Sequence, residues 1–267
     1  MKITSRHNER IKAMIRLHSR KYRDLEGRFI VEGVRMTGEA LSSDWPVECV
    51  VYASSRGEFG TVRALLQRAS AAGIEILEAE NRVFSAISQT EAPQGILAVV
   101  RKRPAPPVIP KGATLVVVLD GVQDPGNLGT VLRSAAAAGA DAVISTLGSA
   151  DLYNAKCLRS AAGAIFHVPA IEGLKPEECV SLLKNAGLRI LVTDPRGGNV
   201  LYDCDMTVPL ALVVGNEGAG VGPSLRSAAD SMVHIPMPGR IESLNAAVAA
   251  SLVIFEAVRQ RAKTSLC

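Results

Sequence analysis

Three short segments combine glycines with carboxylate, amide, hydroxyl or guanidinium side chains, the groups that bind anions and orient hydroxyl groups. Residues 120–133 turn at a Pro-Gly pair and then run into small and apolar residues that end at Arg133. Residues 213–222 hold four glycines around Glu217, and residues 234–245 hold two prolines ahead of Ser243. Each segment follows or overlaps an apolar run typical of a buried strand. Ligands of open parallel sheets bind beyond the carboxyl ends of such strands, so these segments occupy ligand-binding positions.

Each segment also has a purely structural interpretation. Asn127 and Ser243 are residue types that cap helix N-termini, where free N–H groups can also receive an anion. Arg133 is either a surface cation or a planar fork that holds a phosphate or a ribose. The glycines allow a close backbone approach, but neither G-x-G-x-x-G running into a helix nor a P-loop ending is present. Residue types alone therefore leave capping and ligand binding both open.

Taken in order, the three segments resemble the motifs of the SpoU/TrmH family of RNA ribose 2′-O-methyltransferases, part of the SPOUT superfamily. The similarity covers roughly residues 114–262, and residues 158–169 resemble the stretch between the first two motifs. The matching positions are Asn127-x-Gly129-x-x-x-Arg133, then Gly215-Asn216-Glu217-Gly218-x-Gly220, then Ile235-Pro236-Met237 followed by Ser243-Leu244-Asn245.

The resemblance implies an α/β fold: a parallel-sheet methyltransferase domain with a deep C-terminal trefoil knot. It implies S-adenosylmethionine (AdoMet) bound against the knotted loops, and a homodimer whose active site is shared across the interface. By motif position, the cofactor contacts are Gly215, Ile235 and Leu244, with Thr193, Asn216 and Met237 nearby. The catalytic group would comprise Arg133, Asn127, Glu217, Ser243 and Asn245.

The implied reaction is in-line attack of a ribose 2′-hydroxyl on the sulfonium methyl group, in which alignment of the reactants removes much of the entropic barrier. Family proposals make the first-motif arginine the base. Because an arginine guanidinium stays protonated in ordinary proteins, Arg133 is poorly suited to take the proton of the hydroxyl. The guanidinium can more easily stabilise the developing alkoxide and bind the adjacent phosphate. The other four residues of the group would then orient Arg133 and the ribose.

The elements that must position these segments follow an alternating strand and helix pattern in the C-terminal part. This alternation predicts a parallel sheet with helices on both faces. The expected strands are 114–119, 142–145, 189–193, 210–214 and 232–235, and the expected helices are 128–138, 155–165, 176–186, 223–229 and 243–262.

The N-terminal part shows the same alternation and predicts a small α/β sandwich domain. Four prolines within 104–110 mark a linker, because proline excludes regular helix there. We therefore expect a substrate-binding domain over 1–103, a linker over 104–112 and the methyltransferase domain over 113–267. Phe29–Gly33 ahead of a helix resembles the ribosomal-protein-like substrate-binding domain found upstream in the family. The expected helices are 5–20, 36–41, 62–69 and 83–87, and the expected strands are 29–31, 47–52, 74–77 and 95–100.

The net charge of +4 is unevenly distributed along the 267 residues. Residues 1–103 hold 17 Lys and Arg against 12 Asp and Glu, whereas the remainder holds 13 against 14. This basic excess favours phosphate contact, although a solvated basic helix explains it equally well. The candidate RNA-binding residues are Arg6, Arg10, Arg16, Arg20, Lys21 and Arg35.

Several classes are disfavoured by composition. No apolar run approaches the roughly 18 residues of a membrane span, and the polar, basic N-terminus is unlike a secretory signal. Five dispersed cysteines and four histidines without ligand spacing predict neither a disulfide scaffold nor a metal site, and fit a reducing cytoplasm.

The sequence therefore predicts an AdoMet-dependent ribose 2′-O-methyltransferase of large-subunit ribosomal RNA. The alternatives are a tRNA-directed enzyme and a non-catalytic RNA-binding paralogue, although all three motifs are intact. A dinucleotide oxidoreductase is disfavoured by the missing glycine fingerprint after the first strand of the C-terminal part.

Overall fold

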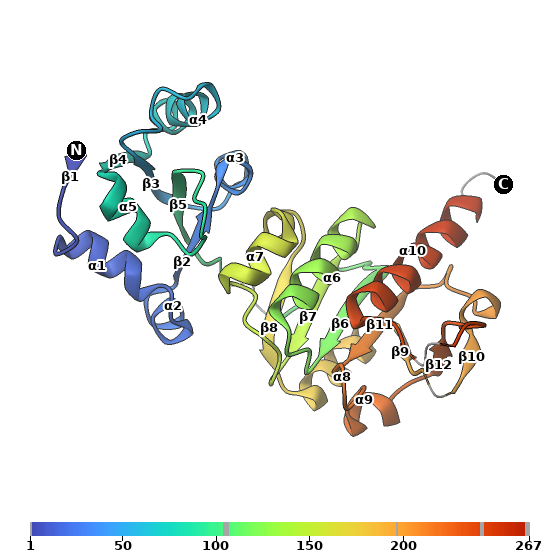
Figure 1. Ribbon diagram of the computed structural model, residues 1–267. Coiled ribbons are helices and arrows are strands. Elements are labelled where there is room, and N and C mark those ends of the chain that lie inside the picture. Colours follow the sequence, from blue (N-terminus) through green and yellow to red (C-terminus); the bar gives the residue numbers. More distant parts are fainter. Residues whose placement is uncertain (1, 104–106, 196, 241–242, 265–267) are drawn as a thin grey trace. The chain divides into compact units, whose positions relative to one another are not determined.

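The computed structural model describes residues 2–103, 107–195, 197–240 and 243–264 (Figure 1). Its contacts group the chain into two compact units. Unit 1 comprises residues 1–104 and 153–166, and unit 2 comprises residues 105–152 and 167–267. Residues 104–106 of the predicted linker lie outside the described part of the chain.

Unit 1 is built on a five-stranded mixed sheet with the order β1-β4-β3-β5-β2. β1, β4 and β3 run parallel, whereas β5 is antiparallel to both β3 and β2. Buried and partly exposed residues alternate along β2, the two-residue period of a pleated strand. The strands are β1 (Lys2–Ile3), β2 (Arg28–Glu32), β3 (Val47–Ala53), β4 (Glu75–Ala79) and β5 (Ile96–Arg101).

Helices cover the sheet of unit 1 on both faces, as a sandwich requires. Ile11 of α1 and Phe84 of α5 share one core with Val51, Leu77 and Leu97 of the strands. α3 and α4 pack against each other, and α3 also contacts β5. The helices are α1 (Glu9–Arg16), α2 (Arg20–Glu26), α3 (Val34–Ser42), α4 (Gly60–Ala71), α5 (Asn81–Ile87) and α7 (Ala155–Ala161), with a 3₁₀ turn at η1 (Ala164–Phe166).

The single helix expected over 5–20 is wrong, because α1 ends at Arg16 and α2 begins at Arg20. The side chain of Arg23 turns inward and is only 4% exposed. Its guanidinium donates to the carbonyl oxygens of Leu17 at 2.7 Å and His18 at 2.8 Å. A buried cation needs such acceptors, and these carbonyls follow the end of α1. The break thus depends on a contact that periodicity along the chain does not reveal.

Residues 153–166, expected within the second domain, pack in unit 1 through an aromatic cluster. The buried ring of Phe29 lies 4.7 Å from Tyr153 and 5.9 Å from Trp45, measured between ring centroids. Phe166 lies 5.6 Å from Trp45, edge to face. With aromatics at only 4% of the sequence, this cluster gathers a large share of them in one place. The contacts explain why a segment distant in sequence joins this unit.

Unit 2 is built on a seven-stranded sheet in which every neighbouring pair is parallel, with the order β10-β12-β9-β11-β6-β7-β8. β6, β7 and β11 are buried along their whole length, as parallel strands covered on both faces must be. This confirms the predicted parallel sheet and adds two strands, β8 and β10. The strands are β6 (Leu115–Asp120), β7 (Ala142–Thr146), β8 (Ala170–Leu174), β9 (Arg189–Thr193), β10 (Asn199–Val200), β11 (Leu210–Gly215) and β12 (Ser231–His234).

The helices of unit 2 divide between the two faces of this sheet. Leu183 of α8 and Leu225 of α9 share a core with Val116 and Val118 of β6. α6 and α10 lie side by side (Figure 1), and the hydroxyl groups of Ser134 and Ser251 are 2.8 Å apart between them. The helices are α6 (Pro125–Ala137), α8 (Pro176–Asn185), α9 (Pro223–Ser227) and α10 (Ala246–Thr264), with a 3₁₀ turn at η2 (Leu201–Asp203).

The aromatic cluster makes Phe29→Ala a test of unit 1. Removing this fully buried ring should cost about 3–5 kcal/mol of unfolding free energy. Trp45 is the only tryptophan, so its fluorescence during urea unfolding reports on the cluster directly. Leu25→Ala, at a side chain 74% exposed, is the control and should change stability by less than about 0.5 kcal/mol. Equal effects of the two substitutions would contradict this packing.

Candidate functional site

The three predicted segments follow three strands of unit 2 at the carboxyl-terminal edge of the sheet. β6 ends at Asp120, β11 at Gly215 and β12 at His234, and β9 lies between β11 and β12. Because all these strands are parallel, the loops that follow them emerge on the same side (Figure 1). The segments are therefore brought to a common edge, as expected.

Asn127 does not cap α6, contrary to the structural interpretation from sequence. The helix begins at Pro125, and Asp124 caps it by accepting a 2.9 Å hydrogen bond from the Asn127 backbone N–H. The Asn127 side chain is thereby left to reach across loops. Its Nδ2 donates to Oε1 of Glu217, and its Oδ1 accepts from Nδ2 of Asn245, both at 2.9 Å. One residue from each motif thus joins a single network, named here the amide–carboxylate network.

Glu217 is the acceptor end of this network. Besides the bond from Asn127, its carboxylate accepts from the backbone N–H groups of Gln123 and Asp124 at 3.4 Å each. Partial burial would raise the pKa of Glu217, but these hydrogen bonds outweigh it and hold the pKa below its ordinary value. Glu217 is therefore ionised at neutral pH and acts as a hydrogen-bond acceptor.

Asn245, rather than Ser243, caps the last helix. Its Oδ1 accepts from the backbone N–H groups of Ala247 at 2.9 Å and Val248 at 3.2 Å, and α10 begins at Ala246. An asparagine caps a helix as well as a serine does, so the residue types allowed the last helix to begin after either Ser243 or Asn245. Ser243 lies exposed in the preceding loop.

Arg133 is exposed on α6, six residues after Asn127. At 3.6 residues per turn, six residues place the two side chains on different sides of the helix. The side chain of Arg133 has no hydrogen bond or ion pair with the described residues, so the structure does not join it to the amide–carboxylate network. A guanidinium left in this state is available for an anionic ligand.

The glycine segment folds back on itself after β11. Asn216 and Gly220 exchange two backbone hydrogen bonds of 3.0 Å. A Cβ at Gly215 would lie 2.2 Å from the carbonyl carbon of Gly220, so only glycine allows this approach. The Asn216 side chain accepts from two loop N–H groups and donates to the Gly121 carbonyl at 2.9 Å. It therefore holds the loop and ties it to the segment after β6.

The remaining candidate cofactor residues lie at the carboxyl ends of β9 and β12. Thr193 ends β9, and its hydroxyl donates to the Val213 carbonyl of β11 at 3.1 Å. Ile235, Met237 and Leu244 are half-buried in the segment that follows β12. Half-buried apolar side chains beyond the carboxyl end of a parallel strand are typical of a ligand-binding wall.

Sequence reasoning missed two buried aspartates at this edge. Asp120 accepts from the Thr146 hydroxyl at 2.8 Å and from the Gly222 backbone N–H at 2.7 Å, which links two loops. Asp194 is only 6% exposed and binds the guanidinium of Arg226 at 2.6 Å. Both follow or end an apolar strand, and an acidic residue at that position was the signal that would have found them.

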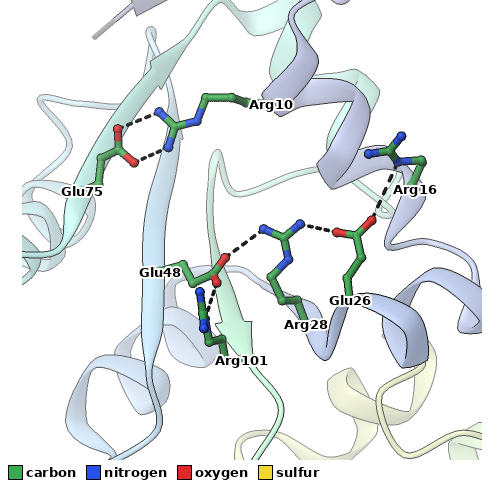
Figure 2. Close-up of polar contacts among 7 residues, drawn as sticks. All are labelled: Arg10, Arg16, Glu26, Arg28, Glu48, Glu75 and Arg101. Atoms are coloured by element: carbon green, nitrogen blue, oxygen red, sulfur yellow. Dashed lines mark hydrogen bonds and ion pairs between the residues drawn. The ribbon is translucent and has the colours of Figure 1, made fainter.

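The candidate RNA-binding residues of unit 1 separate into two groups. Arg10 forms a two-bond pair with Glu75, Arg16 lies 3.8 Å from Glu26, and Arg20 lies 3.5 Å from Asp24. Figure 2 shows the Arg10–Glu75 pair by itself and the Arg16–Glu26 pair as one end of a chain of ion pairs that continues through Arg28, Glu48 and Arg101. The basic excess of the sequence is therefore partly neutralised in the fold.

The other three candidates have no acidic partner among the described residues. Arg6 donates to the carbonyl oxygen of Arg82 at 3.1 Å, and the Lys21 ammonium lies 6.0 Å from the ring centre of Tyr22. Arg35 is exposed at the start of α3. These three cations retain charge for an external anion.

Among the described residues, no group of three or more His, Cys, Asp or Glu side chains is placed to hold a metal ion. None of the described helices combines the length and apolar character needed to cross a membrane. Cys49, Cys157, Cys179 and Cys204 are buried and are not in disulfides. Burial raises the pKa of Cys49 to about 11 and that of Cys179 to about 12, which keeps both protonated.

Comparison with known proteins finds two family matches along the chain. Residues 114–255 match the SpoU rRNA Methylase family, and residues 8–98 match the MRM3-like substrate binding domain. The 23S rRNA (guanosine(2553)-2′-O)-methyltransferase RlmP of Bacillus subtilis is 37% identical, over 95% of this chain and 97% of the relative. The 23S rRNA (uridine(2479)-2′-O)-methyltransferase of Streptomyces viridochromogenes is 36% identical, over 97% and 92%.

Among solved structures, the SpoU methyltransferase AviRb from Streptomyces viridochromogenes in complex with AdoMet superposes with a TM-score of 0.87. It is 34% identical, and the match covers 96% of this chain and 99% of that one. The similarity therefore extends over both units.

The lowered pKa of Glu217 predicts a pH-dependent contribution to stability. Its carboxylate stabilises the fold above pH 4.5, the ordinary value, and this contribution is lost as pH falls through the lower folded-state pKa. Glu217→Gln should therefore cost about 0.5–1.5 kcal/mol at pH 7, after allowance for solvent exposure. The cost should shrink below pH 4.5, as measured by circular dichroism during urea unfolding.

The matched control is Glu91→Gln, at an exposed carboxylate of unit 1. This substitution should change stability by less than about 0.5 kcal/mol at pH 7. A cost for Glu217→Gln that stays constant across this pH range would contradict the assigned charge state.

Proposed function

Because the chain belongs to the SpoU rRNA methylase family, we propose that it transfers a methyl group from AdoMet to a ribose 2′-hydroxyl in 23S-type ribosomal RNA. The observation that carries the proposal is the amide–carboxylate network, which joins one residue from each of three motifs at a single sheet edge. Two relatives named as 23S rRNA methyltransferases align with nearly the whole chain, including its N-terminal part. The named nucleotides differ between these relatives, so the target nucleotide is a separate property.

The residues at the sheet edge suit AdoMet. Ile235 and Leu244 offer half-buried apolar surface, and the tight turn after Gly215 exposes backbone groups of the loop. His234, just before Ile235, has a buried Nδ1 without a hydrogen-bond partner among the described residues. An orphaned polar atom beside apolar side chains is what a heterocyclic ligand would satisfy. The residues proposed to hold AdoMet are Gly215, Ile235 and Leu244, with Thr193, Asn216 and Met237 nearby.

When bound, AdoMet supplies a methyl group on a positively charged sulfonium. The guanidinium of Arg133 is permanently charged and unpaired among the described residues, so it can clamp an RNA phosphate and stabilise negative charge developing on the 2′-oxygen. Asn127, Glu217 and Asn245 keep the three loops in register. The exposed hydroxyl of Ser243 is free to orient the ribose. Positioning of the two reactants then supplies most of the acceleration.

RNA capture is assigned to the N-terminal domain over 1–103, and methyl transfer to residues 113–267. Arg6, Lys21 and Arg35 are the preferred phosphate contacts because no described acidic side chain neutralises them. Arg10, Arg16 and Arg20 would have to exchange an acidic partner for a phosphate. A ribosomal RNA substrate supports the cytoplasm as the proposed location of the reaction.

A homodimer is proposed from an apolar stripe on α10. Val248, Leu252 and Phe255 are 48%, 43% and 47% exposed and recur at intervals of four and three residues, on one side of the helix. An exposed apolar stripe of this kind is typical of a contact surface. We assign it to a second copy of the chain, with the active site shared across the interface.

A trefoil knot is proposed for the C-terminal segment. β12 lies between β10 and β9, and the chain then continues to α10, which packs on α6. This strand order makes the last part of the chain return into the sheet rather than extend it at an edge. Threading of that segment through a preceding loop is the arrangement expected for the family.

The function is tested with radiolabelled AdoMet and purified ribosomal RNA or tRNA. We expect label in large-subunit ribosomal RNA, in a nucleotide resistant to alkaline cleavage because its 2′-oxygen is blocked. Arg133→Ala should lower kcat by about 100- to 1,000-fold, the loss typical of one group that stabilises developing charge. AdoMet affinity measured by calorimetry should change little.

Lys184→Ala, at an exposed cation of α8, is the control and should keep full activity. Label confined to tRNA would refute the assigned substrate, and AdoMet binding without any transfer would refute the enzyme. If Arg133→Ala kept full activity, Arg133 would act neither as the base nor as the group that stabilises charge on the 2′-oxygen.

The proposed dimer is tested by placing a charge in the apolar stripe. Leu252→Asp should convert the protein to a monomer in sedimentation velocity at micromolar concentration, since a desolvated, unpaired carboxylate opposes association. Tyr202→Asp, at a side chain 57% exposed in η2, serves as the control and should remain dimeric. A monomeric wild-type protein, or a dimeric Leu252→Asp variant, would refute this interface.

A further inference from the structure

Unit 1 contains a groove of about 640 Å³ that has no role in the proposal above. It opens beyond the carboxyl ends of the parallel strands β3 and β4. Its lining includes Ser55 and Arg56 after β3, Asn81 after β4, and Gln94 ahead of β5. This volume lies within the range of about 300–1,000 Å³ that small-molecule sites occupy. The groove is therefore large enough for a nucleotide-sized group.

An aromatic platform borders the groove. Phe59 is 51% exposed, whereas the other described aromatic side chains of unit 1 are buried or half-buried. The guanidinium carbon of Arg56 lies 4.7 Å from the centre of its ring. A ring face and a guanidinium plane are the two surfaces on which proteins stack unpaired bases. The pair thus offers stacking surface that the fold itself does not cover.

Arg56 is held in place and keeps its charge. Gly95 has φ +80°, and a Cβ there would lie 2.4 Å from Cγ of Arg56, so this glycine leaves space for the arginine stem. No ion pair or hydrogen bond joins the guanidinium of Arg56 to any described residue, in contrast to the paired arginines of Figure 2. The nearby carboxylate of Glu58 pairs with Arg63 instead, with 3.6 Å between Oε2 of Glu58 and Nη1 of Arg63. A positioned, unneutralised cation in a groove complements a phosphate.

Two amide groups on the groove wall have unused donors. Gln94 accepts from the Val34 backbone N–H at 2.7 Å through Oε1, and Asn81 accepts from the Ser55 backbone N–H at 3.2 Å through Oδ1. These bonds fix both side chains. Their NH₂ groups have no partner among the described residues and can donate to the acceptors of a base edge or a phosphate.

We propose that this groove receives an unpaired nucleotide of the RNA substrate, with its base stacked on Phe59 and its phosphate at Arg56. A base within a duplex is already stacked and paired, so the groove selects looped-out or single-stranded positions. This inference rests on the proposed function and deepens it, because it names the RNA feature that unit 1 recognises. It also explains why a large apolar ring remains exposed beside a free guanidinium.

The test is RNA binding by the full-length chain, measured as fluorescence anisotropy. The probes are a labelled RNA hairpin with an unpaired loop and a blunt duplex of the same length. Wild type should bind the hairpin more tightly. Phe59→Ala should weaken hairpin binding by about 5- to 150-fold, the range that loss of one stacked base gives, and leave duplex binding unchanged.

Two further variants separate stacking from a general loss of structure. Phe59→Trp should keep the affinity for the hairpin, because indole also stacks on bases. Arg56→Ala should weaken hairpin binding and reduce its salt dependence, since one phosphate contact is lost. Leu25→Ala is the control, at another highly exposed apolar side chain of unit 1, and should bind as wild type does.

The outcomes keep the two proposals distinct, because methyl transfer to ribosomal RNA is measured on the same preparations. The groove proposal is overturned if Phe59→Ala binds the hairpin as tightly as wild type does, or if it loses affinity for the hairpin and the duplex equally. The proposed function still stands in that case, provided that the wild-type protein transfers methyl groups to ribosomal RNA. A wild-type protein without preference for the hairpin also overturns it and indicates another partner, such as a protein. If wild type transfers no methyl group, the function fails whatever the binding shows.

Discussion

Two side-chain hydrogen bonds of 2.9 Å hold together loops that are far apart in sequence: Asn127 lies 90 residues from Glu217 and 118 residues from Asn245. Parallel strands bring these loops to one end of the sheet, but the strand ends alone fix neither the positions of the loops relative to one another nor their orientation. The side-chain amide of Asn127 donates to Glu217 in one loop and accepts from Asn245 in the other, so it connects both loops to α6. The same bond contributes to keeping Glu217 ionised, so charge state and loop geometry depend on one contact.

Charge in unit 1 shows a related dependence on pairing. The N-terminal part is basic in sequence, yet many of its arginines form ion pairs that extend from helix to sheet (Figure 2). Such pairs contribute little stability at the surface, but RNA can bind these cations only by displacing their acidic partners. The cations that remain unneutralised, among them Arg35 and Arg56, say more about RNA recognition than the net charge does.

Strands were predictable because their signal is local. Runs such as 115–119 and 210–214 are apolar throughout, and burial on both faces of a parallel sheet requires that composition. Helix starts were less predictable, since Asn127 and Ser243 have capping side chains but Asp124 and Asn245 perform the capping. Residue type supplies several equivalent caps within a few positions. Competing tertiary contacts decide which one is used.

The sequence by itself determined the position and apolar character of most strands, the three motifs and the family, because each depends on residues close together in the chain. Only the tertiary structure decided that Arg23 turns inward, that residues 153–166 pack with unit 1, and that Arg10 and Arg16 are neutralised. It also decided that Asn127 serves as a bridge between loops. Each of these outcomes depends on a partner many residues away or on the removal of a side chain from water, and neither is encoded in spacing along one segment.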